Sequence, residues 1–76
     1  MTSLSTTAQV KISGTITDRT GVPLPGVNVY LEGTYDGTST TGDGAFAFTT
    51  EKTGNQVLVA SFIGFKTHRG EITIVE

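Results

Sequence analysis

The chain has 76 residues, no cysteine and one histidine, and its five basic and seven acidic residues give a formal net charge of −2. A chain this short supports one core, and the lack of cysteine excludes disulfide bonds and thiolate metal sites, so apolar packing must hold the fold. The scattered charges exclude nucleic-acid binding through a basic patch, and no apolar run approaches the roughly 20 residues of a membrane-spanning helix.

Residues 1–9 are rich in serine and threonine and show no apolar pattern. They predict a disordered tail. The small residues Thr6 and Ala8 before Gln9 also resemble the end of a signal peptide, with Met1 standing in for its charged and apolar parts. Both interpretations remain open.

The next segment begins with strict alternation. Apolar or small residues at even positions from Val10 to Ile16 alternate with polar ones, which predicts a half-buried strand. Asp18 to Gly21 then predicts a tight turn, because an aspartate can accept hydrogen bonds from amides ahead of it and glycine supplies a positive φ. Neither Pro23 nor Pro25 has a backbone N–H to donate to a sheet ladder, so this stretch is a connection or the entry to a strand and cannot be a central strand.

Val27, Val29 and Leu31 alternate with polar residues and predict the clearest strand, with its odd-numbered face buried. Turn residues follow at 33–37, and 38–41 predicts a short threonine-rich strand.

A second tight turn is predicted at 42–44, followed by a strand in which Phe46 and Phe48 are the largest core side chains. Residues 56–63 are apolar at both parities, which indicates a central strand covered on both faces or near an end. Residues 71–76 alternate again. No segment has a helical apolar period, so we predict six strands in an all-β sandwich or barrel.

Four segments resemble the carboxypeptidase regulatory-like domain family of transthyretin-like sandwiches. They are Ile12-Ser-Gly-Thr-Ile-Thr-Asp18, Gly21-Val-Pro-Leu-Pro-Gly-Val-Asn-Val-Tyr-Leu-Glu-Gly-Thr34, Thr40-Thr-Gly-Asp-Gly-Ala-Phe46 and Val59-Ala-Ser-Phe-Ile-Gly-Phe65. The resemblance implies an antiparallel Greek-key β-sandwich of about six to seven strands over residues 10–76, with Phe46 and Phe62 filling its core.

The second and fourth segments are most similar to the N-terminal extension of TonB-dependent outer-membrane transporters, especially those that import glycans. This likeness implies an exported, non-catalytic accessory domain in the periplasm at the outer membrane. Its expected partners are the rest of its own transporter chain and envelope proteins. A carbohydrate-binding module is the first alternative, and a regulatory appendage of a peptidase or secreted surface protein is the second.

The family commonly continues past a segment like 71–76 with a turn and a further strand. Either the segment after Gly64 is shortened here, or the last strand is missing and leaves an unpaired sheet edge. We expect such an edge to pair with a second copy of the chain and form a homodimer.

No catalytic residue is predicted. His68 is interpreted as a surface residue in a turn-like stretch, 64–70, and Ser61 lies within a predicted strand without a nucleophile-elbow sequence.

No metal or cofactor site is predicted either. Asp36 and Asp43 lack the ligand spacing of a calcium loop, so Asx-turn roles are expected for them. The glycine-rich stretches 33–37 and 42–44 lack the following helix and lysine of a phosphate-binding loop.

Tyr30 and Tyr35 are the candidate binding residues. Tyr30 lies on the polar face of its strand, and exposed rings on a sheet can stack on sugars. The alternative is that Tyr30 packs beneath a loop or an adjoining domain.

Overall fold

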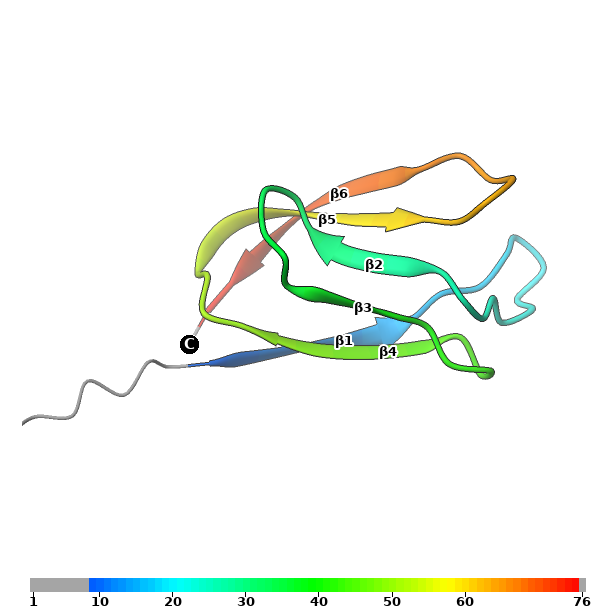
Figure 1. Cartoon of the computed structure of the whole chain (residues 1–76), viewed down its shortest axis with the longest axis horizontal. Coiled ribbons are helices and arrows are strands. Elements are labelled where there is room, and N and C mark those ends of the chain that lie inside the picture. The colour runs from blue at the N-terminus through cyan, green and yellow to red at the C-terminus, as the bar shows by residue number, and fades with distance from the viewer. Residues whose placement is uncertain (1–8, 76) are drawn as a thin grey trace, which may run out of the picture.

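The computed structural model describes residues 9–75, which form six antiparallel strands in two sheets (Figure 1). The smaller sheet pairs β1 (Val10–Thr15) with β4 (Ala45–Thr50). The larger has the order β3-β2-β5-β6, with bounds Gly37–Ser39, Asn28–Leu31, Gly54–Ser61 and His68–Ile74. The prediction of a small all-β sandwich with six strands is confirmed. The proposed signal-peptide remnant lies outside the described residues.

The core lies between the two sheets and follows the predicted alternation. Val29 and Leu31 of β2 have no exposed surface, and Phe46 and Phe48 of β4 lie opposite them in the same buried cluster. The two phenylalanine rings stack with their centroids 6.4 Å apart. Both predicted core faces are therefore confirmed.

Gly14 of β1 makes room for the ring of Phe46. It is the cross-strand partner of Phe46, and a Cβ at Gly14 would lie 2.9 Å from the ring. The missing side chain thus lets the ring lie across the neighbouring strand.

Strand β5 is central in its sheet and apolar on both faces, as predicted. Leu58 and Ala60 pair with Leu31 and Val29 and so share the inner face. Val59 points to the outer face and is nevertheless fully buried. Its cross-strand partners Tyr30 and Arg69 lie on that same outer face. We therefore attribute the burial of Val59 to these long side chains.

The hairpin between β5 and β6 differs from the prediction. β5 ends at Ser61 and β6 begins at His68, so His68 is part of a strand rather than of a turn. Phe62 is only half-buried, because it follows the end of β5 and starts a turn closed by a hydrogen bond from Phe65 N to Phe62 O. The expectation that Phe62 fills the core is thus only partly met.

The sandwich has two sides, and the strands that lie along them differ. β3 and β4 follow each other in the chain and connect the sheets, with Thr40 buried between them. β1 and β6 lie on the other side, and among the described residues each is hydrogen-bonded to one strand only. We call this second side the open side. Among residues 9–75 no helix is long and apolar enough to cross a membrane.

Candidate functional site

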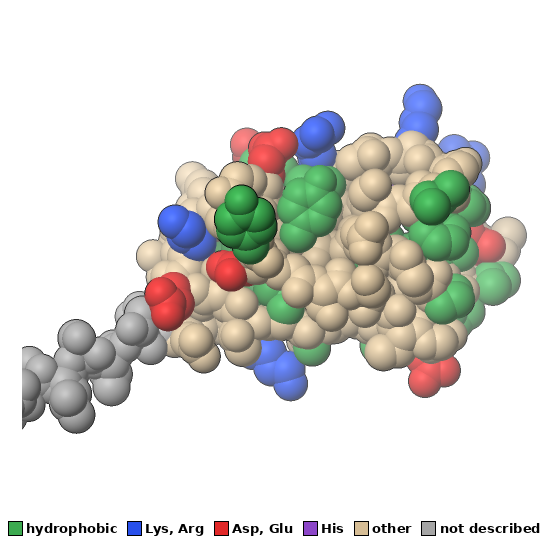
Figure 2. Space-filling model, viewed as in Figure 1, with side chains coloured by type: hydrophobic (Ala, Val, Ile, Leu, Met, Phe, Trp, Pro, Cys, Tyr) green, Lys and Arg blue, Asp and Glu red, His purple; other side chains and the backbone are tan. Residues whose placement is uncertain are grey.

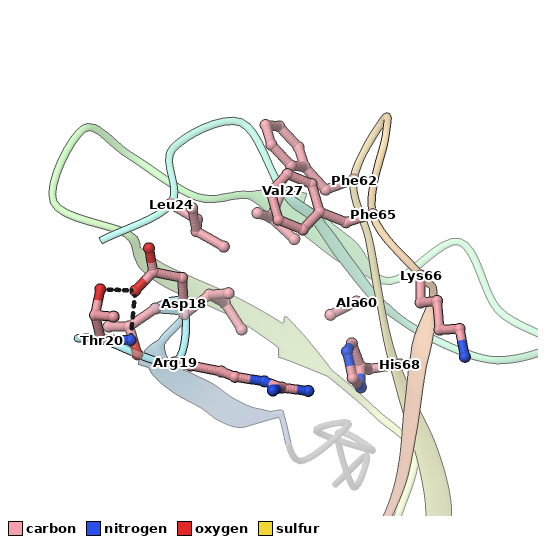
Figure 3. Close-up of a pocket in the computed structure, with 12 residues that line it drawn as sticks. Asp18, Arg19, Thr20, Leu24, Val27, Ala60, Phe62, Phe65, Lys66 and His68 are labelled. Carbon is pink, nitrogen blue, oxygen red and sulfur yellow. Dashed lines mark hydrogen bonds between the residues drawn. The ribbon is translucent and has the colours of Figure 1, made fainter. Parts of the chain in front are cut away.

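A cleft of about 670 Å³ lies at one end of the open side (Figure 3). Its apolar wall contains side chains from the β1–β2 connection, β5 and the β5–β6 hairpin, namely Ile16, Leu24, Val27, Ala60, Phe62 and Phe65. Arg19, Lys66 and His68 also line it. We refer to it as the basic cleft. Its volume lies within the range of small-molecule sites.

The β1–β2 connection forms one wall of the basic cleft and is held by Thr40. The Thr40 hydroxyl donates a hydrogen bond to Leu24 O (2.6 Å) and accepts one from Val27 N (2.9 Å). A buried threonine with both hydrogen-bonding roles fulfilled costs little and fixes the two backbone segments. Leu24 and Val27 are thereby positioned without a regular strand between them.

Asp18 organises the turn beside this wall, as predicted. Its carboxylate accepts hydrogen bonds from Thr20 Oγ1 (2.7 Å), Thr20 N (2.8 Å) and Val22 N (3.0 Å). The Thr20 hydroxyl, followed by the Val22 amide, lowers the pKa of Asp18 below its ordinary value of 3.8. The Asp18 carboxylate thus forms its hydrogen bonds within its own turn.

The basic side chains of the cleft differ from Asp18 in their interactions. Among the described residues the one salt bridge joins Arg69 Nε to Glu32 Oε2 at 3.1 Å, on the outer face of the larger sheet. Arg19 and Lys66 make no ion pair within 9–75. Figure 3 shows the Arg19 side chain extending from the β1–β2 connection toward His68.

Exposed apolar side chains gather beside the basic cleft. Ile63 and Phe65 are 95% and 56% exposed at the hairpin tip, and the rings of Phe62 and Phe65 lie 5.3 Å apart. Figure 2 shows hydrophobic side chains grouped at the end of the molecule that carries this hairpin. The cleft therefore combines an aromatic part with a cationic part.

The two candidate tyrosines lie elsewhere and come together. Tyr30 and Tyr35 line one shallow depression of about 410 Å³ on the larger sheet. Tyr35 is fully exposed and Tyr30 is half-buried. Asn28 and Ser39 share the depression and are joined by a hydrogen bond of 3.1 Å from the Ser39 hydroxyl to the side-chain Oδ1 of Asn28.

The expected Asx-turn role of Asp36 is wrong. Its Oδ2 accepts a hydrogen bond from the buried hydroxyl of Thr50 (2.7 Å), which ties the β2–β3 turn to the end of β4. Asp43 makes no side-chain hydrogen bond among the described residues. Within this part of the chain no three potential metal-ligating side chains lie together.

The sequence interpretation missed the basic cleft. Arg19, Lys66 and His68 lie far apart in the chain, and the sheet arrangement alone brings the two segments together. One signal was present: both segments place a basic residue beside a predicted turn with apolar residues.

Comparisons with known proteins give one family and two relatives. The model of the CarboxypepD_reg-like domain matches residues 12–76. TonB-dependent receptor P39 of Formosa agariphila is 47% identical over 60 residues, which cover 79% of this chain and 6% of the receptor. TonB-dependent receptor SusC of Bacteroides thetaiotaomicron is 38% identical over 58 residues, which cover 76% of this chain and 6% of the receptor. No solved structure matches the chain.

Proposed function

The chain belongs to the carboxypeptidase regulatory-like domain family, and on this premise we propose that it is a non-catalytic accessory domain of a TonB-dependent outer-membrane receptor. The observation that carries the proposal is the match to receptor P39, which covers 79% of this chain and 6% of the receptor. Such a match relates a small module to a much larger protein. The fold supports a binding or connecting role, since its positive-φ glycines serve turns and Phe46 and Phe48 fill the core.

We place the domain in the periplasm, at the N-terminus of a receptor for a glycan or another nutrient. Its partners would be the rest of the receptor chain and envelope proteins. Both matched relatives are receptors, which favours this role over a regulatory appendage of a peptidase or secreted surface protein.

Deletion of the domain from its parent receptor tests the proposal. Residues 10–75 would be replaced by a flexible glycine–serine linker, and receptor abundance in the outer membrane and nutrient uptake would be measured. We expect normal abundance with reduced uptake, because an accessory domain is not needed for barrel insertion. Unchanged uptake would refute a transport role, and protease resistance of the domain after outer-membrane permeabilisation would refute the periplasmic placement.

A carbohydrate-binding role is the second candidate, supported by the placement of Tyr30 and Tyr35 in one depression with Asn28 and Ser39. A sugar ring could stack on Tyr35 while these polar groups accept or donate hydrogen bonds. Titration of the labelled chain with oligosaccharides would shift the Tyr30 and Tyr35 NMR signals, and Tyr35→Ser would abolish the shift. No perturbation at millimolar sugar would remove this candidate.

We further propose that the isolated chain forms a homodimer through the free edge of β6. Antiparallel pairing centred on Gly70 would place Arg69 of each copy across from Glu71 of the other. Opposite charges at facing positions stabilise cross-strand pairs. A free edge of seven residues is long enough for such pairing.

A further inference from the structure

The β5–β6 hairpin ends in a turn that presents apolar side chains to solvent. Phe65 N donates a hydrogen bond to Phe62 O at 3.0 Å, and Gly64 has a φ of 85°, so residues 62–65 form a type II turn. Ile63 at the apex is 95% exposed and does not belong to the core cluster. We call residues 62–65 the apolar tip. Its apex side chain packs on neither sheet.

Exposed apolar side chains are concentrated at this end of the sandwich. Within residues 9–75 five large hydrophobic side chains are exposed, and three of them, Val22, Ile63 and Phe65, belong to the β1–β2 connection and the β5–β6 hairpin. These two segments lie at the same end, where Figure 2 shows hydrophobic side chains with basic ones beside them. A protruding apolar group of this kind indicates an interaction surface.

Basic side chains follow the apolar tip along the hairpin. Residues 61–70 contain Lys66, His68 and Arg69 and no acidic residue. Arg19 extends toward His68 from the facing β1–β2 connection (Figure 3). From its apex toward β6 the hairpin therefore places apolar side chains first and cations next. A phospholipid surface presents the complementary order, because its phosphates lie outside its acyl chains.

Two acidic residues at the same end reduce the electrostatic attraction to an anionic surface. Asp18 forms its hydrogen bonds within its own turn, and Asp43 belongs to the β3–β4 turn, which is hydrogen-bonded to the backbone that follows β1. Their formal charges offset those of Arg19 and Lys66. Apolar insertion must therefore provide most of the affinity, and lipid charge a smaller part.

The exposure of the apolar tip does not depend on the free sheet edges. A strand that pairs with β6 lies along residues 68–74 and leaves the tip uncovered. Val10 and Ile74 both flank the β4–β5 connection, at the opposite end of the sandwich (Figure 1).

We propose that the apolar tip inserts into the surface of a phospholipid membrane, with Ile63 and Phe65 among the acyl chains and Lys66 at the phosphates. Residues 62–65 carry no polar side chain, so they offer a protein partner no directional contact, whereas a fluid acyl layer requires none. The membrane is the periplasmic leaflet of the outer membrane, an assignment that rests on the function proposed above. Connection to a membrane-embedded receptor would raise the effective concentration of a weakly inserting tip.

Vesicle binding of the 76-residue chain tests the proposal. The chain would be sedimented with vesicles of phosphatidylcholine alone and of phosphatidylcholine with about 30% phosphatidylglycerol. We expect binding to both at millimolar lipid, with tighter binding to the anionic vesicles. No binding to either composition would overturn the proposal and leave a protein as the partner of the tip.

Two pairs of variants locate the contact. Ile63→Ser should weaken vesicle binding about tenfold and leave the thermal midpoint unchanged, because the side chain is exposed. Tyr35→Ser removes a fully exposed ring from the β2–β3 turn and is the matched control. Lys66→Gln should weaken binding to anionic vesicles about fivefold, and Lys52→Gln in the β4–β5 connection should not. Equal binding within either pair would contradict the assignment.

Tryptophan fluorescence measures the insertion itself. The chain has no tryptophan, so Ile63→Trp supplies a single indole at the apex. Its emission should shift to shorter wavelength with vesicles and be quenched by lipids brominated on their acyl chains, whereas Tyr35→Trp should show neither effect. An unchanged spectrum of the vesicle-bound Ile63 variant would refute insertion.

The outcomes separate this proposal from the proposed function. Loss of uptake on domain deletion without vesicle binding would retain the accessory role and reject the membrane contact. Vesicle binding that depends on Ile63, together with unchanged uptake, would retain the membrane contact and reject the transport role.

Discussion

Asp18 shows how one side chain shapes a turn that no regular element contains. Its carboxylate collects three hydrogen bonds from two residues ahead of it in the chain, and Gly21 completes the turn at a φ of 90°. The sequence predicts this arrangement well, because all participants lie within five positions and the interaction is local.

Acid should therefore weaken the turn through Asp18. Its pKa in the folded chain lies below the ordinary value of 3.8, so its stabilising contribution is full above that value and is lost as the pH falls through the lower folded value. Urea denaturation at about pH 6 and about pH 3 would measure this loss. We expect Asp18→Asn to reduce the difference between the two pH values, whereas Asp43→Asn should retain it. Equal pH dependence of both variants would show that the Asp18 hydrogen bonds carry no stability.

Phe46 tests the core at the same scale. Its side chain is 8% exposed and packs on Gly14 and Phe48, so Phe46→Ala should lower the free energy of unfolding by about 3–5 kcal/mol. Tyr35→Ala is the control, because Tyr35 is fully exposed and its loss should change stability by less than about 0.5 kcal/mol. Urea denaturation monitored by circular dichroism provides both values. A loss below about 1 kcal/mol for Phe46 would contradict its buried placement. If Phe46→Ala does not fold, Phe46→Leu provides the measurable smaller loss.

At the scale of the elements, Gly44 connects the two halves of the fold. It has a φ of 74°, and a Cβ there would lie 2.5 Å from Ile16 O and 3.1 Å from Leu24 N. Gly44 O also accepts a hydrogen bond from Ile16 N at 2.8 Å. The β3–β4 turn thus packs directly on the backbone that follows β1.

Two glycine variants separate backbone strain from close packing. Gly21→Ala introduces only the left-handed strain, about 1–2 kcal/mol, because nothing lies within 4 Å of its Cβ position. Gly44→Ala adds a collision with backbone atoms and should cost clearly more than Gly21→Ala. Denaturation midpoints of the two variants compare these costs. Similar losses would mean that the turn moves away from Ile16 without penalty.

The elements also show which structure can be predicted from the sequence. The strands with strict alternation, such as the one carrying Val29 and Leu31, were predicted with the correct buried face because one face meets the core and the other meets solvent. The start of β6 was missed, because His68, Arg69 and Gly70 carry no apolar alternation and are held by pairing with β5. Pairing between distant segments leaves no local pattern, which is also why the basic cleft was not predicted.

At the scale of the whole molecule, the arrangement of the sheets leaves strand edges exposed. β6 offers seven residues with Arg69 and Glu71 separated by one glycine, which suits antiparallel pairing with its own copy.

Light scattering over a range of concentrations should show a monomer–dimer equilibrium. Glu71→Pro, which removes an N–H that points away from β5 and one charge of the proposed Arg69–Glu71 pair, should shift that equilibrium to monomer. Gly14→Pro is not a suitable control because Gly14 contacts Phe46, so Lys52→Gln serves instead. A species that stays monomeric at high concentration would refute the dimer.

The positions of Val10 and Ile74 have a mechanical consequence. Val10 pairs with Thr50 and Ile74 pairs with Gly54, so both ends of the described sandwich flank the same β4–β5 connection (Figure 1). Tension applied between these ends would break the interstrand hydrogen bonds of β1 and β6 one after another, beginning at Val10 and Ile74. This follows because antiparallel ladder bonds lie perpendicular to the strands. Unfolding under such tension would therefore begin with β1 and β6 at one end of the sandwich, and the central strands β2 and β5 of the larger sheet would separate later.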